Sequence, residues 1–246
     1  MSRVALLILL VIPVHFSLAL EVVTGDFPPY TGADIQGGGI SSQIVRAAFK
    51  AAGYDDVKVS FTSWSRGFEK TKKSEVAGTF PYVWNADRDA LFLYSAPINI
   101  EYLSYFVRAD DKDAINGKWN DRIVCLPLGW NDTHLKDVKA RFKLMIVQPK
   151  TPEQCLELVD RKRADLFSVN DRVARLANWR LFENPYHLVP SKLERQTDTL
   201  YFIVSRTYPD AQKLINDFNR GLAKIRAEGD YLRLVSEFDQ QQEDSK

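Results

Sequence analysis

Arg88 stands between two apolar segments in a turn-rich part of the chain and is the residue best suited to bind an anion. Residues 76–80 and 91–94 are apolar and predict a buried strand on each side of it. A guanidinium offers two parallel N–H donors and keeps its charge at neutral pH, so it can hold a carboxylate through two hydrogen bonds. The alternative is an ordinary surface ion pair with Asp87 or Asp89. Local sequence leaves both roles open.

Phe27 and Trp64 are candidates for the walls of a binding site because both lie beside loops. Phe27 precedes two adjacent prolines, which disfavour a helix and a central strand, and Trp64 opens a predicted helix after the predicted strand at 57–61. An aromatic face supplies apolar contact area and can attract a cation. The chain contains 5 Trp, 10 Tyr and 14 Phe, so a place in the core is the alternative for each of them.

The length, the net charge and the N-terminal segment indicate an exported globular protein. The chain has 246 residues and a net charge of +1 without a basic block, so nucleic acid is not expected as a partner. Arg3, an apolar run at residues 4–14 and the small residues Ser17 and Ala19 predict a signal peptide at 1–19, cleaved after Ala19. The alternative is an uncleaved membrane anchor, but Pro13 interrupts the run before it reaches a full span.

Export makes the two cysteines informative. Cys125 lies in a predicted strand and Cys155 near the start of a predicted helix. Two cysteines in an oxidising compartment often pair, so we expect a disulfide, with two buried free thiols as the alternative. No histidine stands at ligand spacing from either cysteine, so a metal site is not expected, and no cofactor is expected either.

The periodicity predicts two successive α/β units. The first has strands at 20–24, 57–61 and 76–80 and helices at 40–52 and 63–73. The second has strands at 123–128, 144–148 and 166–169 and helices near 132–142 and at 151–162. The polar segment 110–120 predicts an exposed loop, and a helical segment at 210–238 is divided by Gly229.

The segment from Arg88 to the sequence Tyr-Ser-Ala-Pro at 94–97 resembles the signature of extracellular solute-binding proteins of family 3, the amino-acid-type periplasmic proteins of ABC transporters. The resemblance implies the type II periplasmic binding-protein fold, an α/β fold in which a two-strand hinge joins two α/β lobes. Lobe 1 would comprise residues 20–100 and 199–246, and lobe 2 residues 101–198. The hinge strands would cross near 100–102 and 197–199. Arg88 would clamp the carboxylate of the ligand.

The resemblance also places other residues at the ligand. Phe27 and Tyr30 match an aromatic-x-Pro-aromatic loop, so both would contribute to the site. Gly129, Trp130 and Asn131 match a turn at a helix N-terminus whose backbone N–H groups receive a carboxylate, although Trp130 and Asn131 replace hydroxyl residues of the family pattern.

A second departure concerns the amine of the ligand. Asn170 stands where the family has the Asp that pairs with the ammonium of the ligand. Either Asp171 serves after a shift of one residue, or the ligand is not an α-amino acid. The alternative for Asp171 is a cap on the following helix.

These observations predict a monomeric binding protein that captures a small carboxylate-bearing solute, and an amino acid is the preferred candidate. It would close by a hinge motion and deliver the solute to an ABC permease in the inner membrane. One alternative is an exported, dehydratase-like enzyme on the same scaffold, for which Glu101 is the carboxylate to inspect. The other is a detached ligand-sensing domain, since a fold alone does not decide function.

Overall fold

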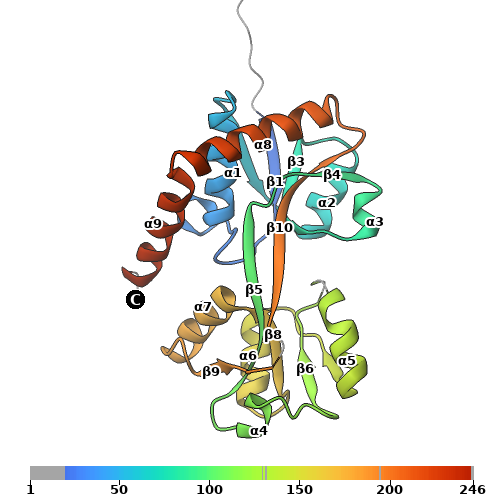
Figure 1. The fold of residues 1–246 in the computed structure, drawn as a ribbon, viewed down its shortest axis with the longest axis vertical. Helices are drawn as coiled ribbons and strands as arrows, with labels where there is room; N and C mark the ends of the chain where they lie inside the picture. The colour runs from blue at the N-terminus through green and yellow to red at the C-terminus, as the bar shows by residue number, and fades with distance from the viewer. Residues whose placement is uncertain (1–19, 129, 131, 194, 245–246) are drawn as a thin grey trace, which may run out of the picture.

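The computed structural model describes residues 20–128, 130, 132–193 and 195–244. Two α/β lobes lie one above the other and are joined by two long strands (Figure 1). The predicted signal peptide at 1–19 and two of the predicted site residues, Gly129 and Asn131, lie outside the described residues. Within the described part of the chain, no helix combines the length and the apolar character needed to cross a membrane.

The upper lobe in Figure 1 is built on three parallel strands, with β1 between β2 and β3. Its elements are β1 (Leu20–Thr24), the 3-10 turn η1 (Gln36–Gly38), α1 (Ile40–Ala51), β2 (Val57–Phe61), α2 (Trp64–Lys72), β3 (Gly78–Val83), α3 (Ala86–Asp89), β4 (Phe92–Tyr94), α8 (Ala211–Ala227) and α9 (Asp230–Asp244). Helix α1 buries one apolar face, which includes Ile44 and Phe49. Gly221 lets α8 approach it, because a Cβ there would lie 1.9 Å from the Ala48 carbonyl oxygen.

Two strands of ten residues each, β5 (Asn99–Arg108) and β10 (Gln196–Ser205), run antiparallel from one lobe to the other (Figure 1). They make the sheet continuous across the molecule, in the order β2-β1-β3-β10-β5-β8-β6-β7. Residues 100–102 pair with residues 197–199, and Glu101 stands directly opposite Asp198. The two strands are therefore the hinge, and the lobe boundaries at 100–101 and 198–199 stay a prediction.

The lower lobe packs short helices around β6 (Ile123–Cys125), β7 (Met145–Val147) and β8 (Leu166–Asn170). Its other elements are α4 (Lys112–Ile115), the 3-10 turn η2 (Thr133–Leu135), α5 (Lys136–Phe142), α6 (Pro152–Asp160), α7 (Asp171–Phe182) and β9 (Leu188–Pro190). The predicted disulfide is confirmed: Cys125 at the end of β6 is bonded to Cys155 in α6, and their Cα atoms are 5.5 Å apart. Free thiols are thereby excluded at both positions.

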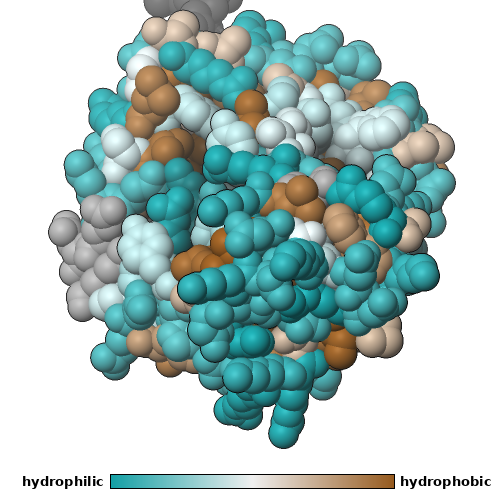
Figure 2. Space-filling model, turned by 60° about the horizontal axis from the view of Figure 1, so that its bottom comes forward, coloured by the Kyte–Doolittle hydropathy of each residue, from teal (hydrophilic) through white to brown (hydrophobic). Residues whose placement is uncertain are grey.

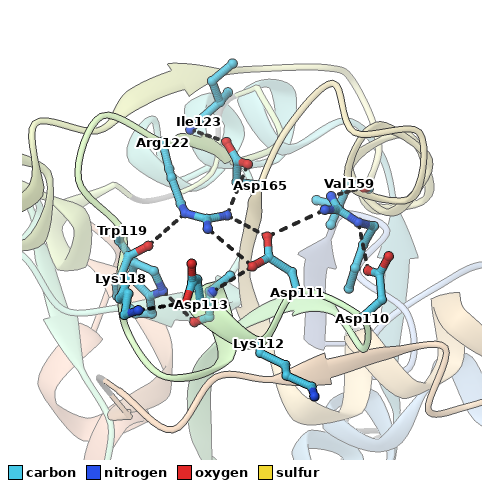
Figure 3. A network of polar contacts seen from close by, with 12 residues as sticks. Asp110, Asp111, Lys112, Asp113, Lys118, Trp119, Arg122, Ile123, Val159 and Asp165 are labelled. Carbon is cyan, nitrogen blue, oxygen red and sulfur yellow. Dashed lines mark hydrogen bonds and ion pairs between the residues drawn. The ribbon is translucent and has the colours of Figure 1, made fainter.

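The prediction of an exposed loop at 110–120 is confirmed only in part, because most of these residues are exposed but Lys112–Ile115 form the short helix α4. Trp119 in this segment is completely buried, and the segment forms a polar network with residues outside it, among them Arg108, Arg122 and Asp165 (Figure 3). The Arg122 guanidinium donates to Asp111 at 2.6 Å and to Asp165 at 3.3 Å, while Asp111 also accepts from the Ala114 amide and caps α4. Asp111 and Arg122 are paired and mostly covered, whereas Asp113 and Lys118 pair at the surface, and a count of local charges cannot reveal this difference.

Candidate ligand-binding cleft

Two adjacent cavities lie between the lobes. The outer one has a volume of about 760 Å³ and the inner one about 150 Å³. The same five residues line both, and they come from both lobes: Phe27, Trp64, Tyr82, Arg88 and Trp130. Since these residues are shared, they stand at the junction of the two cavities. Three positions predicted from different parts of the sequence, Phe27, Trp64 and Arg88, are thus brought together with Trp130.

Arg88 belongs to the one-turn helix α3 rather than to a loop that re-enters a strand. Asn85 caps this turn by accepting from the Arg88 amide at 2.8 Å. The guanidinium donates from Nη1 to the Val83 carbonyl at 2.8 Å and lies 5.2 Å from the centre of the Tyr82 ring. These contacts fix the direction of the side chain, and most of its five donors have no hydrogen-bond partner among the described residues.

The alternative of a surface ion pair for Arg88 is wrong. Among the described residues, no carboxylate lies within 4.0 Å of its guanidinium, and Asp89 faces Arg206 at 3.8 Å instead. A positive charge that is half-buried, oriented and without an acidic partner is suited to an anionic ligand.

The aromatic walls come from both lobes. Trp64 begins α2, donates from Nε1 to the Asp26 carbonyl at 3.2 Å, and packs edge-on against Tyr82 with ring centres 5.6 Å apart. Phe27 and Trp130 meet edge to face at 5.3 Å across the cleft. Tyr30, another predicted ligand contact, is only 3% exposed and stacks behind Phe27 at 5.1 Å. The structure therefore places it as a support for Phe27.

Gly25 leaves room for the Trp64 ring, which packs directly against the backbone at this position. A Cβ on Gly25 would lie 2.5 Å from the Trp64 ring, so we expect Gly25→Ala to displace the indole and to lower the free energy of unfolding by about 1–3 kcal/mol. Gly67→Ala, in the same helix as Trp64, is the control, because its Cβ would meet ordinary contacts no closer than 3.4 Å. Near-ultraviolet circular dichroism and urea unfolding measure both effects; equal behaviour of the two variants would contradict this account.

Asn170 and Asp171 have different surroundings. The Asn170 side chain caps α7 by accepting from the Val173 amide at 2.9 Å, and it donates to Glu101 Oε2 at 2.8 Å. Asp171 accepts from Ser104 at 3.0 Å and from Arg195 at 3.0 Å. The N-terminal cap of this helix is therefore Asn170, and not Asp171 as considered from the sequence. Asn170 lines the inner cavity, whereas Asp171 is engaged by Ser104 and Arg195.

Glu101 and Asp198 are acidic groups of the hinge that line the inner cavity. Glu101 is 5% exposed, and burial raises its pKa to about 8, although the hydroxyl of Tyr30 and the amide of Asn170 act in the other direction. Burial also raises the pKa of Asp198. From the sequence, Glu101 is expected only as an enzymatic acid, and Asp198 is not expected at the site. The pairing of the two predicted hinge strands was the signal that could have found it.

His134, also missed from the sequence, lies on the same cavity. Its Nε2 is 2.7 Å from the Ser168 hydroxyl, and burial lowers its pKa to about 4, so the imidazole is neutral at pH 7.

The turn at 129–131 is expected from the sequence to stand at the N-terminus of a helix. Instead, the 3-10 turn η2 comes first, and the regular helix α5 starts only at Lys136. Among the described residues, no group of three or more His, Cys, Asp or Glu side chains is arranged as metal ligands.

Solved structures with this fold include the periplasmic VFT2 domain of BvgS from Bordetella pertussis, which has 18% sequence identity and a TM-score of 0.74 and covers 89% of this chain and 93% of that chain. A mutant of ArgBP from T. maritima has 16% identity and a TM-score of 0.71 and covers 90% and 96%. The ancestral amino acid-binding protein AncCDT-1, a precursor of cyclohexadienyl dehydratase, has 19% identity and a TM-score of 0.68 and covers 89% and 95%. At such identities the likeness establishes the fold, which is the type II periplasmic binding-protein fold.

No curated protein matches the chain in sequence. The sequence profile of one family does match, over residues 20–240, which include almost all of the described residues and both lobes. The chain therefore belongs to the bacterial extracellular solute-binding proteins, family 3.

Proposed function

We propose that this protein captures a small carboxylate-bearing solute, an amino acid, in the cleft between its lobes, with Arg88 holding the carboxylate. The observation that carries the proposal is the oriented Arg88 guanidinium, which lines both cavities and has no acidic partner among the described residues. Phe27, Trp64 and Trp130 supply the apolar walls of the site. Two similar structures carry the names of amino-acid-binding proteins, which agrees with this choice of ligand.

The same proposal includes the route of the protein and its partner. The exported chain loses its signal peptide after Ala19, works in the periplasm as a monomer, and passes its solute to an ABC permease after the lobes have closed about the hinge. Figure 2 shows a face on which hydrophobic residues form small, separate patches in a mostly hydrophilic surface. Such a surface is compatible with a monomer, because large apolar patches mark permanent interfaces.

Arg88→Ala tests the carboxylate clamp. A lost charge-assisted hydrogen bond of about 1.5–3 kcal/mol should weaken binding of the carboxylate at least about tenfold. The measurement is a thermal-shift screen of residues 20–246 against amino acids and small carboxylic acids, followed by calorimetric titration of the hits; a ligand at about a hundred times its dissociation constant stabilises the protein by about 2.7 kcal/mol.

The control for this test is Arg66→Ala. Arg66 is an exposed arginine of α2 that lines neither cavity, so this substitution removes the same charge from the lobe without touching the site. Unchanged affinity in Arg88→Ala, or an equal loss in both variants, would exclude Arg88 as the clamp.

An enzymatic role is the second candidate, and the buried Glu101 favours it. A carboxyl group with a pKa of about 8 that faces a cavity is mostly protonated at pH 7 and can act as a general acid. Proton NMR of each bound solute over several hours separates the two functions. Conversion of the solute that stops in Glu101→Gln would establish an enzyme, whereas an unchanged solute agrees with a binding protein or a sensor.

A further inference from the structure

The inner cavity brings two acidic side chains of the hinge to the same place as Arg88. Glu101 on β5 and Asp198 on β10 are directly opposite each other in an antiparallel pair, and such residues point to the same face of a sheet. Both line the cavity of about 150 Å³ that Arg88 also lines. A small cavity lined by a cationic group and two carboxyl groups is suited to a ligand that carries both charges.

Glu101 is not satisfied by the protein alone. Its Oε2 accepts from the Asn170 amide at 2.8 Å, while its Oε1 is buried and makes no hydrogen bond of good geometry to a described residue, although the Tyr30 hydroxyl is near enough to lower the pKa of Glu101. A buried carboxyl oxygen without a hydrogen-bond partner is costly, and a hydrogen bond with a ligand would remove that cost. Asp198 is half-buried and accepts no hydrogen bond from a described residue, so its carboxylate is left for the cavity.

The polar and charged groups around Glu101 come from several elements. Tyr30 approaches from the loop after β1, Asn170 and Arg172 from the start of α7, and Asp198 from β10. The charge of Arg172 is balanced by an ion pair with Asp239 of α9, in which two hydrogen bonds join the side chains. His134 on the same cavity is neutral at pH 7. No described cation other than Arg88 lines the inner cavity.

We propose that Glu101 and Asp198 form a cation subsite that receives the ammonium group of a zwitterionic ligand whose carboxylate is held by Arg88. This inference rests on the proposed function and names the residues that would distinguish an amino acid from a simple carboxylic acid. It also gives Asn170 a role: the amide donates to Glu101 Oε2 and orients the carboxylate, so the negative charge that Asn170 lacks is provided by the hinge.

Binding at this subsite is coupled to a proton. In the free protein at pH 7, Glu101 holds a proton because burial raises its pKa to about 8. The ammonium keeps its own protons and donates to the Glu101 carboxylate, so the carboxyl proton leaves to the solvent. The binding of an amino acid should therefore release up to one proton at pH 7, whereas binding of the same acid without its amine should release none.

The cation subsite can be tested without the carboxylate half of the site. The pKa of Glu101, followed by carbon NMR of the labelled carboxyl group, should fall by about one unit in about 0.2 M methylammonium chloride relative to the same concentration of sodium chloride, which screens equally. Asp198→Asn should reduce this fall. An unchanged pKa in methylammonium would overturn the cation subsite, whatever the result with Arg88.

The second test compares each of the twenty L-amino acids with the acid that lacks its α-amino group. By calorimetry in phosphate and in Tris, wild type should prefer one amino acid at least about tenfold over the acid and release a proton on binding. Glu101→Gln should lose the preference and the proton release but keep its affinity for the acid. Asp56→Asn, an exposed carboxylate outside both cavities, is the matched control and should behave as wild type.

The outcomes separate this inference from the proposed function. Loss of all carboxylate binding in Arg88→Ala, with no difference between amino acids and their deamino acids in wild type, would support the clamp and overturn the cation subsite. A shift of the Glu101 pKa by methylammonium, with no carboxylate bound by wild type, would support the subsite and overturn the clamp. Loss of the amine preference in Asp171→Asn, and not in Glu101→Gln, would place the ammonium at Asp171 and also overturn the inference.

Discussion

Replacing Cys125 and Cys155 together by alanine is expected to lower the free energy of unfolding by about 3–4 kcal/mol, because the disulfide closes a loop of 30 residues and its loss returns that loop-closure entropy to the unfolded chain. The bridge ties β6 to α6, and both cysteines are completely buried. Alanine avoids a buried hydroxyl, so the loss should reflect the bridge and a small cavity rather than an unsatisfied polar group.

Urea unfolding of the double variant and of the oxidised wild type gives the difference, and the dependence on urea shows whether the unfolded chain has expanded. Neither cysteine lines the cavities, so ligand affinity at low urea should be unchanged. A loss of stability below about 1 kcal/mol would contradict the loop-entropy account for this chain. A loss of affinity with unchanged stability would indicate instead that the bridge positions the lower lobe for binding.

The fold and part of the site could be predicted because their determinants are local. The apolar face of α1, the alternation of strands and helices, and the strand–Arg88–strand segment are all patterns of consecutive residues. Phe27 and Trp64 could also be predicted as site residues, because each stands where a loop meets a regular element. Their meeting at one junction required the fold, which the family resemblance supplied and the periodicity did not.

Features that depend on pairing across the chain could not be predicted. The strand predicted to end at Phe80 continues as β3 through Pro81 to Val83, because the pairing with β10 is irregular opposite Pro81 and does not require its missing N–H. Trp119 looked exposed because its covering partners lie elsewhere in the sequence. The same holds for the subsite: Glu101 and Asp198 are almost 100 positions apart and become neighbours only through the register of the hinge strands.

Replacing Glu101 by glutamine is expected to remove most of the alkaline destabilisation of the ligand-free protein. The pKa of Glu101 is raised from 4.5 in the unfolded chain to about 8 by burial, so the folded state binds more protons than the unfolded state between these values. Stability therefore falls as the pH rises through that window, by about 1.4 kcal/mol for each pH unit. Between about pH 6.5 and pH 9 the wild type should lose about 2 kcal/mol that the variant keeps.

His134 sets the lowest pH at which the contribution of Glu101 to stability can be measured separately. Burial lowers its pKa from 6.5 to about 4, so its contribution has the opposite sign: stability is lost as the pH falls from 6.5 toward 4. Below about pH 6.5 the two residues oppose each other, and above it the difference between wild type and Glu101→Gln isolates the carboxyl group. Urea unfolding at a series of pH values, without ligand, measures this difference. Parallel stability curves for the two proteins from about pH 6.5 to pH 9 would show that Glu101 is already ionised in the free cleft, and the proton release proposed for amino acid binding would then have no source.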